Sequence, residues 1–366
     1  MNRRWFRAVT FGLVALVAIA VQLRSRPPLM ATGGGFTDDI DAPARLSETG
    51  LYVPGRVGVV DPRNRRFSPQ YPLWSDGAIK NRWVFVPSGA TIDARDDSSW
   101  EFPVGTRFWK EFTFDGRKVE TRMLWKATAS RWIAVSYIWN DVQTDALLAP
   151  DAGEPGIVSV GANRRHSIPS TNDCLACHGA KRTEPLGFNA LQLSTDRDPN
   201  AIHGEPLPEG AVTLRTLVDE RLIAPARTDL VAAPPRIRST SSRTRSMLGY
   251  LTTNCGSCHR GSTDIATQVP SLKYSDVMRD GDAVAASLVG RKTAWQVPGV
   301  ADGASVIVDV EAPERSAMLA RMRSRSPSSQ MPPLGTVIRD QVAVDALSQW
   351  TTADLSVLIR AGRGRQ

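Results

Sequence analysis

Two short phrases of the sequence contain all four cysteines, and each phrase has the order C-x-x-C-H. The residues are Cys174, Cys177 and His178 in TNDCLACHG, and Cys255, Cys258 and His259 in TTNCGSCHR. On a helical turn, residues i, i+3 and i+4 share one face, so two thiols and an imidazole point the same way. This order is the attachment signature of c-type haem, in which thioethers hold the porphyrin and histidine binds the iron. We therefore expect two covalently bound haem c groups.

Other uses of paired cysteines explain these phrases less well. Disulfides in an exported chain would use the cysteines but leave His178 and His259 unexplained. A zinc site would need the two C-x-x-C pairs to be much closer in sequence than Cys177 and Cys255 are. A thioredoxin-like redox pair needs neither the duplication nor the adjacent histidine.

A methionine downstream of the second motif is a candidate for the opposite side of the second iron. The phrase SSQMPPLGT places Met331 in a loop that Pro332 and Pro333 stiffen. Histidine and methionine are a known axial pair of c-type haem. A buried core methionine is the commoner role of this residue type, so that alternative stays open. Met318 and Met322, at positions i and i+4, are expected to be core contacts.

The first haem has no comparable partner, because no methionine lies between His178 and Met247. The candidate ligands are His166 and His203, with Met247 less favoured, and an open or lysine-ligated iron is a further alternative. A surface histidine near a turn is the ordinary interpretation of either histidine.

The N-terminus predicts export. Arginines precede an apolar run from about Ala8 to Leu23, which indicates a signal peptide or membrane anchor over residues 1–23, followed by a linker over 24–45. We expect a periplasmic protein, cleaved free or held at the inner membrane by this anchor alone. The net charge of +8 is spread over single arginines without a basic run, so nucleic acid is not an expected partner.

Strands are expected over residues 46–165. RFWKEFTF and the alternating run Lys118–Trp125 are joined at Asp115-Gly116 as a hairpin, and NRWVFVP and RWIAVSYIWN predict further strands. Seven of the ten tryptophans fall between Trp74 and Trp139, which suits the interior of an antiparallel β-sandwich.

The predicted fold is multidomain, with the β-sandwich followed by an all-α class I cytochrome c domain. Residues 166–235 would carry the first haem against the sandwich and include a helix at LRTLVDERL. Residues 236–366 would form the cytochrome c domain with the second haem, after a linker at APPRIRSTSSRTR. Its expected helices precede Cys255, begin at Pro313, and follow an N-cap at Asp340. Loop carboxylates at Asp76, Asp141 and Asp145 are minor candidates for a cation site.

Several phrases together resemble an uncharacterised bacterial family of secreted di-haem c-type cytochromes with a β-rich N-terminal region. They are LSETGLY, YPLWSDGAIKNRW, WEFPVGTRFWKEF, SYIWNDVQTDALL, PSTNDCLACHG and QMPPLGT. The similarity extends from about Leu46 to Trp350. It implies haem attachment and ligation at the two motifs and at Met331, but it implies no substrate.

The sequence therefore predicts a periplasmic di-haem cytochrome that transfers electrons between redox proteins of the periplasm or membrane. One alternative is a haem enzyme of peroxidase or oxygenase type, with an open first haem that the second haem supplies with electrons. Another is a β-domain that binds a partner and carries a tethered cytochrome. No constellation of nucleophile, base and acid is visible, so hydrolase chemistry is not expected.

Overall fold

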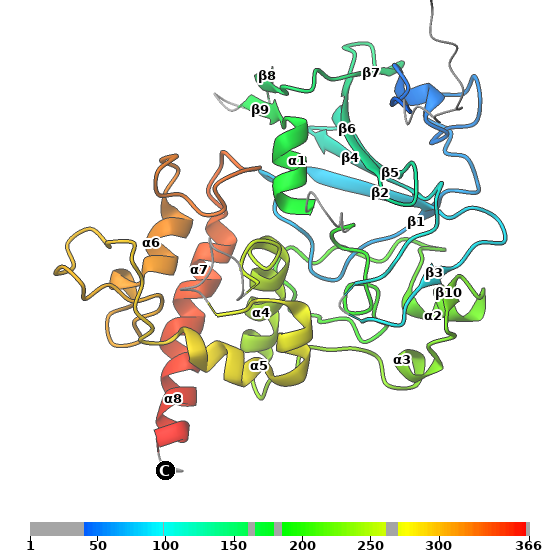
Figure 1. Ribbon diagram of the computed structural model, residues 1–366. Coiled ribbons are helices and arrows are strands. Elements are labelled where there is room, and N and C mark those ends of the chain that lie inside the picture. Colours follow the sequence, from blue (N-terminus) through cyan, green and yellow to red (C-terminus); the bar gives the residue numbers. More distant parts are fainter. Residues whose placement is uncertain (1–39, 98, 160–164, 179–184, 261–269, 364–366) are drawn as a thin grey trace, which may run out of the picture. The chain divides into compact units, whose positions relative to one another are not determined.

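The computed structural model describes most of the chain after the first 39 residues (Figure 1). The described residues are 40–97, 99–159, 165–178, 185–260 and 270–363. The predicted signal segment, and the predicted linker up to residue 39, lie outside them. Within the described ranges, every helix is too short or too polar to cross a membrane.

An antiparallel sheet of six strands, in the order β1-β2-β4-β5-β6-β7, dominates the first part of the described chain (Figure 1). Its strands are β1 (Arg65–Arg66), β2 (Ile79–Phe85), β4 (Arg107–Phe114), β5 (Arg117–Lys126), β6 (Trp132–Trp139) and β7 (Ala146–Leu148). Two smaller sheets pair β3 (Ile92–Asp93) with β10 (Ile223–Ala224), and β8 (Glu154–Ser159) with β9 (Arg165–Ile168). The four strands predicted from alternation are confirmed.

The predicted hairpin turn between β4 and β5 is also confirmed. Asp115 and Gly116 have φ values of 48° and 77°, and a two-residue turn of type I′ needs positive φ at both positions. The pairing of Phe114 with Arg117 follows directly from this turn. Because side chains alternate along a strand, this register decides which residues of β4 and β5 face each side of the sheet.

Both faces of the large sheet are buried. One face contributes Trp109, Met123 and Tyr137 to a cluster with Leu46 and Leu51. The opposite face packs Phe108, Leu124 and Ala134 against residues from later in the chain, among them Phe188, Leu193 and Leu214. The described residues contain no second sheet of similar size, so the structure differs from the predicted sandwich. Alternation in a strand shows that a face is covered but not what covers it.

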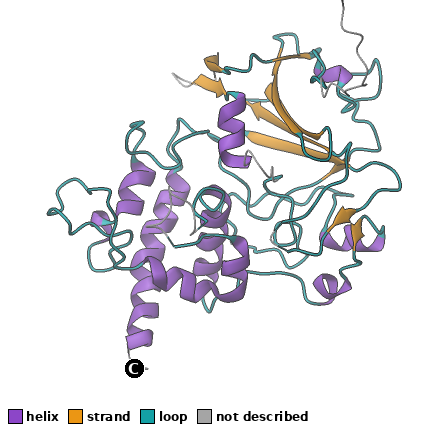
Figure 2. Ribbon diagram, in the orientation of Figure 1, coloured by secondary structure: helices purple, strands orange, loops and turns teal. Residues whose placement is uncertain are grey.

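Most of the helices lie in the later half of the chain (Figure 2). The helices and helical turns are η1 (Leu46–Glu48), α1 (Thr171–His178), α2 (Leu214–Asp219), α3 (Thr228–Ala232), α4 (Ser242–Asn254), α5 (Tyr274–Leu288), η2 (Pro313–Arg315), α6 (Ala317–Arg323), α7 (Gln341–Trp350), the π-turn η3 (Thr351–Leu355) and α8 (Ser356–Arg363). The helices expected before Cys255, from Pro313 and after Asp340 are all present. The Asp340 side chain accepts the Ala343 N–H at 3.0 Å, as an N-cap should.

Residues of α4, α5, α6 and α7 meet in one apolar core. Leu248, Leu347 and Trp350 are buried in it, and Trp350 Nε1 donates to Thr244 Oγ1 at 2.9 Å. The phrase predicted to be a linker is part of this packing. Ile237 is fully buried, and α4 already begins at Ser242. The polar composition of that phrase indicated a linker, but one of its serines, Ser241, is the N-cap of α4.

The loop before β2 joins the sheet to the helices. The ring of Tyr71 lies so close to α4 that a Cβ on Gly249 would come within 2.2 Å of it. The carboxylate of Asp76 accepts the backbone N–H groups of Val337 and Ile338 at 3.0 and 2.8 Å, just before α7. These contacts bring the phrase YPLWSDGAIKNRW between the two predicted haem regions.

Candidate haem-binding sites

The first motif occupies α1. Ser170 precedes this helix, and its N–H and Oγ donate to the carboxylate of Asp173 at 3.0 and 2.8 Å, while the Asp173 N–H donates back to Ser170 Oγ. Such reciprocal bonds satisfy donors that a helix start leaves unpaired. The helix then holds Cys174, Cys177 and His178 at positions i, i+3 and i+4. The structure therefore brings the three predicted residues together on one helical face.

The surroundings of the first motif are apolar and positively charged. Helix α1 packs on β6, and Cys174 adjoins the cluster that contains Ala134 of that strand (Figure 1). Burial raises the pKa of the Cys174 and Cys177 thiols, and the nearby Arg122 cation of β5 partly opposes the increase. A buried thiol with a raised pKa is a poor nucleophile, so these thiols lack the properties of catalytic cysteines.

The second motif forms a turn at the end of α4. The N–H groups of Cys258 and His259 both donate to the carbonyl of Cys255, at 3.1 and 2.9 Å. Only glycine fits at Gly256, because a Cβ there would lie 2.4 Å from the Thr252 carbonyl oxygen. Burial raises the pKa of the Cys255 thiol to about 12. The three predicted residues of this motif are thus also held within one turn.

The imidazole of His259 has the properties of an unused ligand. Its Nδ1 is buried and has no hydrogen-bond partner among the described residues. Burial, and then the charge of Arg321, lowers its pKa, so the neutral form that binds iron is favoured. A buried polar atom without a partner costs free energy. The residues of this motif therefore fit a haem.

The loop that carries Met331 lies next to α6. The Met331 N–H donates to the carbonyl of Arg321 at 3.0 Å, and Arg321 Nε donates to the Ser329 carbonyl at 3.1 Å. The charge of Arg321 also acts on His259, so Met331 and His259 are both near Arg321. Met322 is buried in the helical core, as expected.

The three candidate ligands of the first iron are engaged elsewhere in the described structure. His166 is 5% exposed, so the expectation of a surface histidine is wrong, and its Nε2 lies 2.7 Å from Glu120 Oε2. Its ring is buried against Phe112 and Phe114 of the large sheet. His203 Nε2 lies 2.9 Å from the Asp340 carboxylate. Met247 is 1% exposed in the helical core.

The two motifs adjoin in the fold. Burial is the main cause of the raised pKa of Cys177, and the second cause is the negative charge of Cys258. The carboxylates of Asp76, Asp141 and Asp145 are not brought together. Asp76 binds backbone N–H groups before α7, Asp145 pairs with Arg45, and Asp141 pairs with Arg117. In the part of the chain that the structure describes, no group of three His, Cys, Asp or Glu residues could hold a metal ion by itself.

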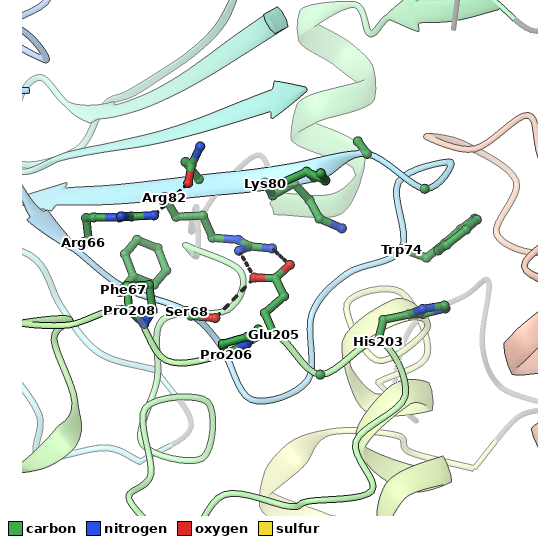
Figure 3. Close-up of a pocket in the computed structure, with 15 residues that line it drawn as sticks. Arg66, Phe67, Ser68, Trp74, Lys80, Arg82, His203, Glu205, Pro206 and Pro208 are labelled. Carbon is green, nitrogen blue, oxygen red and sulfur yellow. Dashed lines mark hydrogen bonds and ion pairs between the residues drawn. The ribbon is translucent and has the colours of Figure 1, made fainter. Parts of the chain in front are cut away.

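Sequence reasoning missed a row of cations on the sheet face toward α1. Arg82, Lys110 and Arg122 lie directly opposite one another on β2, β4 and β5. The sequence pattern that could have indicated this row is the presence of charged residues at inward positions of tryptophan-rich strands. Lys80 and Arg82 also line a cavity of about 380 Å³, shown in Figure 3.

Comparison of the chain with family models, with curated proteins and with solved structures finds no match. The two motifs and their surroundings are therefore the only indications of function.

Proposed function

We propose that this chain is a di-haem c-type cytochrome that transfers electrons between redox proteins of the bacterial cell envelope. Each C-x-x-C-H motif would hold one covalent haem c, with His178 and His259 as axial ligands and Met331 opposite His259. When bound, each haem supplies one-electron chemistry. The N-terminal apolar run, residues 1–23, is the basis for placing the protein in the periplasm or at the inner membrane.

The observation that carries this proposal is the local geometry of both motifs. Each presents two free cysteines and a histidine within one helical turn. Their positions in the fold add to it, because Cys177 and Cys258 are within electrostatic reach of each other. Two neighbouring haems suit a protein that passes electrons in series, with the helices α4, α6 and α7 supporting the second haem.

The test counts covalent haems by mass in protein purified from a periplasmic fraction. We expect two per chain in the wild type and one in the Cys174→Ala/Cys177→Ala variant. The matched variant Cys255→Ala/Cys258→Ala should also retain one. A wild-type chain without covalent haem, or a double variant that still carries two, would refute the assignment.

A second candidate function is a haem enzyme of peroxidase or oxygenase type. The observation that favours it is that His166, His203 and Met247 are each engaged in the described structure. The first iron would then lack a strong sixth ligand from this set, and could bind an external ligand instead.

Carbon monoxide distinguishes the two functions. An electron carrier with both irons fully ligated should show only low-spin haem and no spectral change when reduced and exposed to carbon monoxide. A shift on about half of the haem would favour the enzyme. The Cys174→Ala/Cys177→Ala variant is the control, because it lacks the first haem and should then show no shift.

A further inference from the structure

The cation row consists of Lys80, Arg82, Lys110 and Arg122, all on one face of the large sheet. The strand register pairs Arg82 with Lys110 and Lys110 with Arg122. Lys80 is two residues before Arg82 on β2, so it faces the same side. Like charges directly opposite one another destabilise a sheet. The row is therefore an arrangement that the fold alone does not favour.

Two carboxylates contact the row, one at each end. Arg82 donates twice to Glu205, at 2.6 and 3.1 Å (Figure 3). Arg122 donates twice to Glu120, at 2.7 and 2.9 Å. Glu120 also contacts His166, so its carboxylate is not available to neutralise a second cation of the row.

The two lysines have weaker partners. Lys80 Nζ donates to the neutral carbonyl of Leu73 at 2.8 Å. The Lys110 ammonium has no hydrogen bond or ion pair to any described residue, and it lies 4.9 Å from the centre of the Phe112 ring. Burial among the neighbouring cations lowers its pKa well below the ordinary value. Four basic side chains thus face two carboxylates. Each carboxylate pairs with an arginine, so neither lysine side chain has a carboxylate partner among the described residues.

The row begins beside the first motif. Helix α1 packs on β6, and the charge of Arg122 on the neighbouring strand acts on both Cys174 and Cys177. Lys110 also acts on Cys177. From β5 the row continues through β4 to β2. Strands are about 4.8 Å apart, so it extends over about 10 Å, a length comparable to the width of a porphyrin.

We propose that Lys110, with Lys80, Arg82 and Arg122, binds the two propionate groups of the haem attached at the first motif. The thioethers would hold one edge of the porphyrin at α1, which would leave the propionates of the opposite edge for the row. The two propionates would give the two lysines carboxylate partners and favour their charged forms. This inference rests on the proposed function, because it requires a haem at Cys174 and Cys177.

The row also sets the potential of that haem. Fixed positive charges favour the ferrous state, which is less positive than the ferric state, so they raise the midpoint potential. A unit charge in a partly buried site changes the ratio of ferrous to ferric protein about tenfold, which is about 59 mV for one electron. Removing one cation should lower the midpoint of the first haem by about this amount.

The test is a redox titration of the full chain carrying Lys110→Gln. We expect the midpoint of the first haem to fall and that of the second to stay unchanged. The first-haem midpoint is the one that disappears in Cys174→Ala/Cys177→Ala. Lys110→Arg keeps the charge and should retain the wild-type value. Should Lys110→Gln fold poorly, Lys110→Met removes the same charge.

Lys118→Gln is the matched control, because Lys118 belongs to the same sheet but pairs with Glu111 beside Tyr52 and Trp139. It should leave both midpoints unchanged. Equal shifts in the Lys110 and Lys118 variants, or no shift in either with two haems attached, would overturn the propionate site and leave the proposed function intact. A wild-type chain without covalent haem would instead refute the proposed function.

Discussion

Glu120 is the residue that ties the first haem region to the sheet. Its carboxylate is fully buried, and it accepts hydrogen bonds from Arg122 and from Ser136 Oγ at 2.7 Å. His166 completes the group at 2.7 Å. Burial raises the pKa of Glu120, but Arg122 and the hydrogen bond from His166 outweigh burial and lower it from 4.5 to about 2.

We expect Glu120→Gln to lower the free energy of unfolding by about 3–5 kcal/mol, because it leaves a buried cation without its anion. The loss should depend on pH. A carboxylate with a lowered pKa stabilises the fold fully above the unfolded value, and this stabilisation disappears as pH falls toward about 2. Denaturant unfolding at several pH values measures the difference between variant and wild type, which should shrink in acid.

The matched variant is Glu220→Gln. Glu220 pairs with Arg65 at 2.6 Å, but 44% of its side chain is exposed. Exposed pairs contribute about 0–1 kcal/mol, so this change should be small at every pH. If both variants lost the same stability, the buried network around Glu120 would not have the role assigned to it.

Met331 provides the second prediction at the scale of single residues. A thioether opposite histidine raises the potential relative to two histidines. Replacing Met331 with histidine should therefore lower the midpoint of the second haem, leave that of the first nearly unchanged, and remove the weak near-infrared band of ferric haem bound to sulfur. Met322→Leu is the control, because Met322 is a core residue. A wild-type spectrum without that band, or a band that survives in Met331→His, would show that Met331 is also a core residue.

The sequence could identify functional residues only where their arrangement is set within a few neighbouring residues. Cys174, Cys177 and His178 lie within one turn, so their spacing alone predicted a shared face. The burial of His166 depends on its contacts with Glu120 and Phe112 of the large sheet, which its neighbours in sequence do not reveal. The position of Lys110 between two arginines depends on a register across three strands.

At the scale of elements, periodicity and caps predicted most of the structure. Alternation located β2, β4, β5 and β6, and Asp115-Gly116 fixed one hairpin because few other residues accept positive φ. Asp340 marked the start of α7. The covering of the sheet was not predictable in the same way. Phe188 comes from an irregular segment whose local pattern carries little signal, and the predicted helix at LRTLVDERL, observed as α2, did not indicate that Leu214 packs on the sheet.

At the scale of the whole molecule, the sheet and the helices meet at the loop before β2. Tyr71 belongs to the helical core, and its hydroxyl donates to Asp198 at 3.1 Å. The same loop leads within a few residues into β2. A substitution that displaces Tyr71 should therefore destabilise both the sheet and the helical core, because neither can relax without moving the other.

Gly249→Ala tests this coupling. Alanine favours a helix by about 1 kcal/mol over glycine, so an unobstructed site would be stabilised. Here the new Cβ would lie 2.2 Å from the Tyr71 ring, and overpacking of this kind typically costs about 1–3 kcal/mol. We expect tryptophan fluorescence, which reports mainly on the sheet, and far-ultraviolet circular dichroism, which reports on the helices, to shift together to lower denaturant concentration.

Ser242→Ala is the control on the same helix, because Ser242 is exposed at the first turn of α4. A surface change there should alter stability by less than about 0.5 kcal/mol. If Gly249→Ala shifted the circular dichroism transition alone, the sheet and the helices would unfold independently. A common shift would mean that the sheet and the helices unfold as one cooperative unit through the loop from Tyr71 to Asp76, which would hold the two C-x-x-C-H motifs at a fixed separation.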